Sequence, residues 1–202
     1  MSKPRDQVRE IWNWQRCQNR IRTLSGRLGF PDTDNIRFLG LRLSLTDGSI
    51  YDELKNEAYK GSEVSIYFIL SGYANAKPTP ETGRLISFKQ LTGGEAYFKA
   101  FTEHAIQPLV TTFSPEPQIL VKAAKLLGGT PQSYGDYSVK IFSLPQVPLT
   151  IILWTKSAEF SASANILFDS NANSCLTTEE LAGLSGLTLT RLKNAIETLK
   201  KD

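Results

Sequence analysis

The chain has 202 residues, of which 41% are hydrophobic and 21% charged, and a formal net charge of +3. These values are typical of one compact globular domain and exclude a wholly disordered chain. The longest apolar runs, such as residues 149–154, are too short to cross a bilayer, and residues 1–10 lack the apolar segment of a secretory signal. We therefore expect a cytoplasmic protein.

The content of cysteine and histidine limits the metal chemistry. Cys17 and Cys175 lie far apart in the sequence, and His104 is the single histidine. A structural zinc site needs four such ligands, and an iron–sulfur cluster usually needs four thiolates. Neither site can be built from the cysteines and histidine of this chain alone. A disulfide between the two cysteines remains open, although such bonds are uncommon in a reducing compartment.

The first 27 residues are strongly basic. They contain seven lysines and arginines against two acidic residues, a balance of +5, so the rest of the chain carries −2. An amphipathic helix is expected over residues 5–25, with an apolar stripe formed by Val8, Ile11, Trp12, Ile21 and Leu24. Its basic face is interpreted as a solvated surface of a packed helix, with contact to nucleic acid or an acidic partner as the alternative.

The next elements follow from apolar periodicity and turn residues. Near-alternating apolar residues at 37–45 predict a half-buried strand, and Asp47-Gly48 favours a tight turn into a return strand. Residues 53–72 and 95–113 have helical spacing, and Pro108 is expected to kink or end the second of these helices near residue 107.

The second half of the chain predicts a hairpin followed by helices. Residues 139–144 and 149–154 are rich in strand-forming residues and are separated by Pro-Gln-Val-Pro. Further elements are expected as a helix over 118–127, a short strand at 165–168 and helical structure from Thr177 onward. The sum is an α+β fold in which an antiparallel sheet packs against several helices, with helical N- and C-termini. We expect a basic N-terminal helix over 1–30 and a single α+β domain over 31–202.

Residues 177–199 resemble a helix-turn-helix of bacterial regulators. Ala182 is followed four residues later by Gly186, where a turn would separate two helices. The exposed readers of DNA would be Thr188, Thr190, Arg191, Lys193 and Asn194. Residues 178–202 carry no net charge, however, and DNA affinity rests largely on phosphate neutralisation. Two helices packing on the sheet are therefore the favoured interpretation, and a DNA-binding regulator is the alternative.

A polar edge follows the apolar hairpin. Asn165 and Asp169 lie four residues apart, so an extended backbone projects both side chains to one face. Together with Trp154 they would frame a pocket that has a flat apolar wall and two polar anchors. The alternative is that both side chains accept hydrogen bonds from loop amides. No nucleophile elbow, dinucleotide fingerprint or Walker loop is present, so no catalytic residue is assigned.

Four segments carry a family resemblance. They are GRLISFKQLTGGEAYFKAF (83–101), LGGTPQSYGDYSVKIFSLPQVPLTIILW (127–154), SASANILFD (161–169) and LTTEEL (176–181). Across residues 36–192 the chain resembles the family catalogued as domain of unknown function 3786. Members come mostly from anaerobic bacteria and archaea, and some carry the domain behind a cysteine-rich iron–sulfur module that this chain lacks. The resemblance implies anaerobic redox or corrinoid-linked metabolism and no known catalytic residues.

The expected function is therefore the binding of a small molecule or of a protein partner. The ligand would be a flat cofactor such as a corrinoid or another tetrapyrrole, and the partner an iron–sulfur or corrinoid protein. Trp154 and Phe168 would supply the apolar wall of the cofactor site. The residues expected to orient the cofactor are Gly93, Gly94, Asp136, Asn165 and Asp169.

Overall fold

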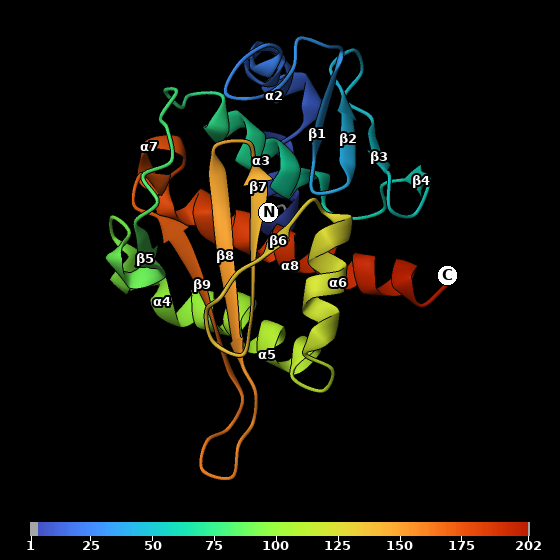
Figure 1. Ribbon diagram of the computed structural model, residues 1–202. Helices are drawn as coiled ribbons and strands as arrows, with labels where there is room; N and C mark the ends of the chain where they lie inside the picture. Colours follow the sequence, from blue (N-terminus) through green and yellow to red (C-terminus); the bar gives the residue numbers. More distant parts are fainter. Residues whose placement is uncertain (1–3, 202) are drawn as a thin grey trace.

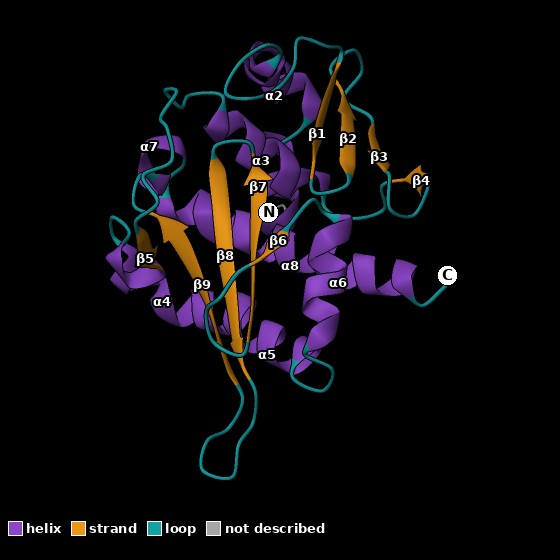
Figure 2. Ribbon diagram, in the orientation of Figure 1, coloured by secondary structure: helices purple, strands orange, loops and turns teal. Residues whose placement is uncertain are grey.

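The computed structural model of the protein describes residues 4–201. Two antiparallel sheets and a group of helices form the fold, which is α+β as predicted (Figure 1). The larger sheet lies on one side of the molecule, with helices behind it, and the smaller sheet lies beside the N-terminal helices (Figure 2). Residues 35–58 form a second, smaller sheet of their own, which the sequence prediction did not separate from the larger one.

The two sheets are built from short and long strands. The smaller has the order β1-β2-β3-β4, with β1 (Asn35–Phe38), β2 (Leu41–Ser44), β3 (Ile50–Asp52) and β4 (Glu57–Ala58). The larger has the order β5-β9-β8-β7-β6, with β5 (Leu85–Ser87), β6 (Thr130–Pro131), β7 (Tyr137–Leu144), β8 (Val147–Trp154) and β9 (Ser163–Asp169). Every strand pair in both sheets is antiparallel.

The helices vary from one turn to six turns. They are α1 (Pro4–Ile11), α2 (Trp14–Ile21), α3 (Glu63–Tyr73), α4 (Gly94–Phe101), α5 (Gln107–Phe113), α6 (Gln118–Leu126), α7 (Ala172–Cys175) and α8 (Thr178–Leu199). Two 3-10 turns, at Arg22–Leu24 and Phe88–Gln90, and a π-helical segment at Thr102–Ile106 complete the set.

The central strands β7, β8 and β9 form the middle of the core. Their inner face pairs Ile141 with Leu149 and Leu149 with Phe168, and all three side chains are fully buried. Phe168 also packs with two further rings, those of Phe88 and Phe101, which stack on each other with their centroids 3.9 Å apart. Full burial of one such side chain contributes roughly 1.5–3 kcal/mol, so this cluster fixes β9 against the helices.

Helix α8 runs without interruption behind the larger sheet. Its start is a capping box, in which the Thr177 hydroxyl accepts from the Glu180 amide while the Glu180 carboxylate accepts from the Thr177 amide. The predicted turn at Gly186 was wrong. Glycine inside a helix costs about 1 kcal/mol, which the burial of Leu184 and Leu192 on either side outweighs.

Two other elements differ from the sequence predictions. The predicted strand 37–45 is a hairpin, because Leu39 and Gly40 both adopt positive φ (51° and 68°) and reverse the chain between β1 and β2. This is the φ pattern of the two-residue turns that suit antiparallel strands. The predicted helix 53–72 begins only at Glu63, since residues 57–58 pair with β3.

Proline and asparagine explain two helix irregularities. The chain stays helical through Pro108 but widens to a π-helix at Thr102–Ile106, because proline has no amide to donate to the preceding turn. The irregularity was therefore predicted at the correct position, although the helix does not end there. The predicted helix 5–25 is broken, because Asn13 leaves the helical conformation (φ −136°, ψ 166°) and caps α2.

The N-terminal segment packs into the same core as the rest of the chain. Cys17 and Ile21 of α2 are buried in the cluster that contains the larger sheet. The Tyr73 hydroxyl on α3 donates to the Leu28 carbonyl at 2.8 Å and accepts from the Gln146 amide at 3.1 Å. These contacts tie the N-terminal segment to the β7–β8 turn. The division of the chain at residue 30 remains a proposal about its organisation.

Candidate functional site

Asp169, one of the predicted cofactor anchors, accepts its hydrogen bonds from neighbouring residues of its own chain. It is 1% exposed and accepts hydrogen bonds from the Thr82 amide (3.0 Å), the Thr82 hydroxyl (2.8 Å), the Gly83 amide (2.8 Å) and the Asn171 amide (3.1 Å). Burial alone would raise the pKa of Asp169, but these hydrogen bonds outweigh it and hold the pKa below its ordinary value of 3.8. The carboxylate oxygens of Asp169 therefore hold the loop at residues 82–83 in place.

The predicted wall does not form. Trp154 pairs with Ser163 and Leu149 pairs with Phe168, so Trp154 and Phe168 lie on opposite faces of the larger sheet. Phe168 is fully buried in the core, whereas Trp154 is 39% exposed on the outer face. The residues present at this edge therefore do not fit a corrinoid or another tetrapyrrole, because no flat cavity lies between the two rings.

The remaining predicted anchors do not converge either. Asn165 shares a face with Asp169 but lies about 13 Å away along the strand, and its side chain accepts from the neighbouring Ile166 amide. Asp136 accepts from the Thr155 amide and hydroxyl, both at 2.7 Å. Gly93 and Gly94 form the start of α4, where Gly93 adopts a positive φ of 74°. Each residue serves local structure.

Two of the five predicted DNA-reading residues, Thr188 and Arg191, are buried. Arg191 is fully buried and forms a two-point ion pair with Asp52, in which both N–O distances are 2.6 Å. It also donates to the carbonyls of Leu39 (3.0 Å) and Gly40 (3.2 Å) in the β1–β2 turn. Thr188 is fully buried and shares a hydrogen bond with the Ser143 hydroxyl at 2.8 Å.

Among the predicted readers, Thr190 and Lys193 are exposed and Asn194 is half-buried. These three residues lie on a continuous helix that has no turn before it. The helix-turn-helix prediction was therefore wrong in geometry, and Arg191 holds the β1–β2 turn to α8.

A pocket of about 880 Å³ opens beside the two N-terminal helices α1 and α2. Its lining comes from three separate segments: the α1–α2 corner, the β2–β3 turn and the start of α3. The volume lies within the range that small-molecule sites usually occupy, about 300–1,000 Å³. Trp12 supplies a half-buried aromatic wall and packs edge-on against Phe68, with the ring centroids 5.0 Å apart.

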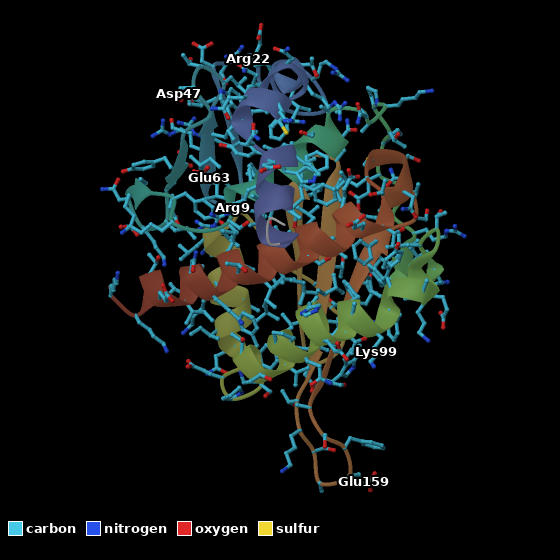
Figure 3. The ribbon with its side chains drawn as sticks, turned by 180° about the vertical axis from the view of Figure 1, so that it is seen from behind. Arg9, Arg22, Asp47, Glu63, Lys99 and Glu159 are labelled. Atoms are coloured by element: carbon cyan, nitrogen blue, oxygen red, sulfur yellow. The ribbon has the colours of Figure 1, made fainter. Side chains whose placement is uncertain are left out.

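The pocket has charged groups of both signs. Arg9 and Lys60 are its cations, and Asp47 and Glu63 are its anions. Figure 3 shows Arg9, Glu63 and Asp47 on the same side of the long helix α8, with Arg9 nearest to this helix and Asp47 farthest from it. Hydrogen bonds from Ser49 and Ser44 lower the pKa of Asp47 to about 2, so this carboxylate stays ionised. Balanced charges favour a ligand that carries both signs over a polyanion.

Hydrogen bonds hold the rim of the pocket in place. Asn13 accepts from the Arg16 amide at 3.1 Å and donates to the carbonyls of Arg9 and Glu10, which fixes the α1–α2 corner. The Tyr67 hydroxyl donates to the Gly48 carbonyl at 2.9 Å. Burial raises the pKa of Tyr67 to about 12, so its hydroxyl keeps its proton at neutral pH.

The start of α3 adds amide donors at the pocket. Ser62 is the N-cap residue, but its side chain makes no capping hydrogen bond. The first amides of a helix have no partner within the helix and carry a partial positive charge. Gly61, Ser62, Glu63 and Val64 all line the pocket, so these amides lie near its space.

Sequence reasoning did not identify this pocket. Trp12 was assigned to the apolar stripe of a helix, and Asp47-Gly48 was interpreted only as a turn. The available signals were the Asn13 cap between two tryptophans and the turn residues at 47–49. They did not reveal the site, because its three segments are brought together only by tertiary packing.

Cys17 and Cys175 are both buried and free. No group of three or more metal-ligating side chains occurs within residues 4–201. In the same range, no helix is both long and apolar enough to cross a membrane.

Comparisons with known proteins give one match. Neither the curated proteins nor the solved structures contain a significant match to the chain. A family model described as "Domain of unknown function (DUF3786)" matches residues 25–191. This span includes both members of the Asp52–Arg191 pair, the larger sheet and most of the pocket lining. The chain therefore belongs to this family of domains of unknown function.

Proposed function

We propose that this chain is a binding domain whose site is the pocket beside Trp12. The observation that carries the proposal is the combination of a half-buried aromatic wall with two cations and two anions. The matching ligand class is a small zwitterion that has a flat apolar part, such as an aromatic amino acid or a short peptide. Trp12 would contact the flat part, and Arg9 and the start of α3 would bind its carboxylate.

The acidic side chains of the pocket would bind the positively charged end of the ligand. The ionised Asp47 carboxylate, supported by Glu63, would bind the ligand's ammonium group. No residue of this pocket is a thiol or an imidazole, so we propose binding without covalent chemistry. The proposal keeps the cytoplasmic location that the sequence led us to expect, and the family resemblance implies an anaerobic host.

A thermal-shift and calorimetric screen tests the proposal. The probes are L-phenylalanine, dipeptides that contain phenylalanine, flavin mononucleotide and hydroxocobalamin. A probe at 100 times its Kd stabilises the protein by about 2.7 kcal/mol, which is a rise of several degrees in Tm. Trp12→Leu should remove that rise, and Trp154→Leu, on the outer face of the sheet, should retain it. A screen without any stabilising zwitterion, or an equal loss in both variants, would contradict the proposal.

A second candidate is a protein partner at the same place. Val8 and Ile11 of α1 are 45% and 51% exposed, and they lie one turn before Trp12 and directly before it, respectively. Exposed apolar residues beside a pocket favour docking of a peptide segment. The partner would be the iron–sulfur or corrinoid protein that the resemblance implies. Val8→Ser with Ile11→Ser should weaken this partner's binding and leave L-phenylalanine binding unchanged.

A further inference from the structure

The β8–β9 hairpin projects from the body of the molecule. Residues 155–162 form a loop below the larger sheet in Figure 1, and Figure 3 shows Glu159 at its far end. All eight residues of this loop are half-buried or exposed. Phe160 is 72% exposed, more than any other large hydrophobic residue among those described. An aromatic side chain held this far from the core has no role in the fold of the chain itself.

Hydrogen bonds order both the tip and the base of the hairpin. At the tip, the Ser157 amide donates to the Phe160 carbonyl at 2.9 Å, and the Ser157 hydroxyl accepts from the amides of Glu159 and Phe160. At the base, Asp136 accepts from the amide and hydroxyl of Thr155. Because the loop is already ordered, less conformational entropy is lost when it binds a partner.

Two further exposed aromatic residues lie at the base. Trp154 ends β8 and is 39% exposed, and Tyr134 is 45% exposed on the loop before β7. Gly135 lies against the Trp154 ring, where an added Cβ would stand 3.2 Å from it, so the loop that carries Tyr134 runs beside Trp154. Aromatic residues of this kind are enriched at protein interfaces and carry much of their binding energy.

The charges of the hairpin favour a second copy of the chain as the occupant. Lys156 and Glu159 have no opposite charge within 4 Å among the described side chains, and together they carry no net charge. The exposed Asp136 at the base adds a negative charge, so the surface has no net positive charge to attract nucleic acid or an anionic membrane. Two such hairpins related by a two-fold axis are complementary, because each Lys156 can meet the other copy's Glu159.

We propose that Tyr134, Trp154, Lys156, Glu159 and Phe160 form a self-association surface through which two copies of the chain make a two-fold dimer. Closed two-fold dimers are the commonest soluble oligomers, and their interfaces are self-complementary patches of this kind. A contact made by two hairpins is small, so the dimer is weak and reversible. It lies at the end of the molecule opposite α2, so dimerisation leaves the pocket beside Trp12 open.

Sedimentation velocity of the full chain up to about 1 mM tests the proposal, since compact interfaces associate weakly. The expected result is a reversible monomer–dimer equilibrium. Phe160→Ser should raise the dimer Kd by about 30-fold. Phe142→Ser, which removes a 48% exposed phenylalanine from β7, should leave the Kd unchanged. A monomer at every concentration, or equal weakening by both variants, would overturn the proposal.

Charge reversal tests the two-fold geometry independently. Lys156→Glu and Glu159→Lys each place like charges opposite one another and should weaken self-association several-fold at low salt. A mixture of the two single variants restores both ion pairs and should form a heterodimer about as tight as the original dimer. The double variant should dimerise alone. Failure of both the mixture and the double variant to recover association would overturn the two-fold arrangement.

Discussion

Two polar regions of the chain differ in where their hydrogen bonds go. At the end of β9, Asp169 is buried and accepts four hydrogen bonds from its own protein. At the pocket, Arg9 and Glu63 are exposed and take part in no ion pair among the described side chains. A buried carboxylate such as Asp169, whose oxygens are all used by its own fold, is therefore a weaker candidate for a ligand contact than exposed, unpaired groups such as Arg9 and Glu63.

The largest expected effect is on the buried ion pair. Arg191→Ala leaves the Asp52 carboxylate buried and frees two turn carbonyls. The expected loss is about 3–5 kcal/mol in the free energy of unfolding, measured by urea denaturation. Lys193→Ala, on the exposed face of the same helix, should change it by less than about 0.5 kcal/mol. Equal effects of the two variants would refute the structural role of Arg191.

A smaller loss is expected at the end of β9. Asp169→Asn keeps the shape of the side chain but replaces a charged acceptor of four hydrogen bonds by a neutral amide. The free energy of unfolding should fall by about 1–3 kcal/mol, measured by the same denaturation. Asp136→Asn changes an exposed carboxylate that accepts from Thr155 alone and should cost less. If Asp169→Asn were neutral, the carboxylate would be free for a ligand after all.

The pH dependence of stability follows from the same carboxylates. For Asp52 and Asp169, burial tends to raise the pKa, but hydrogen bonds and, for Asp52, the Arg191 charge outweigh it and lower the pKa below 3.8. A lowered folded-state pKa stabilises the protein above the unfolded-state pKa, and that contribution is lost as the pH falls through the folded value. Stability should therefore drop below about pH 4, and Asp169→Asn should make the drop shallower. Unchanged pH curves would contradict this assignment.

The smallest effect on stability is expected at the pocket. Arg9→Ala should change the free energy of unfolding by less than about 0.5 kcal/mol, because the side chain is exposed. It should nevertheless weaken the binding of L-phenylalanine, measured by calorimetry, because it removes the cation for the carboxylate. Arg16→Ala, an exposed arginine of α2 outside the pocket lining, is the matched control. A large stability loss in Arg9→Ala would assign the pocket charges to the fold.

The local sequence pattern was sufficient to predict most of the larger sheet. The apolar runs at 139–144 and 149–154 predicted β7 and β8, because strands covered by helices carry continuous apolar residues. Pro145 likewise identified the turn between them. The break at Gly186 was wrong because the local cost of one glycine is smaller than the packing of α8, which is a tertiary effect.

The local sequence pattern could not predict the candidate site. The donors to Asp169 include Thr82, 87 residues earlier in the chain, so the sequence left open whether this carboxylate was free. The opposite orientation of Trp154 and Phe168 depends on the strand register, which pairs Phe168 with Leu149, five residues before Trp154 on β8. The pocket joins segments from residues 9 to 67 that no short motif connects.

The most direct test of the central claim uses the indole signals of the three tryptophans, Trp12, Trp14 and Trp154, in a two-dimensional NMR titration with L-phenylalanine. Single Trp→Phe variants assign the signals. If the pocket at α1–α2 is the binding site, the Trp12 signal moves saturably while the Trp154 signal stays in place. Movement of the Trp154 signal with a static Trp12 signal would instead place the site at the outer face of the larger sheet and contradict the account.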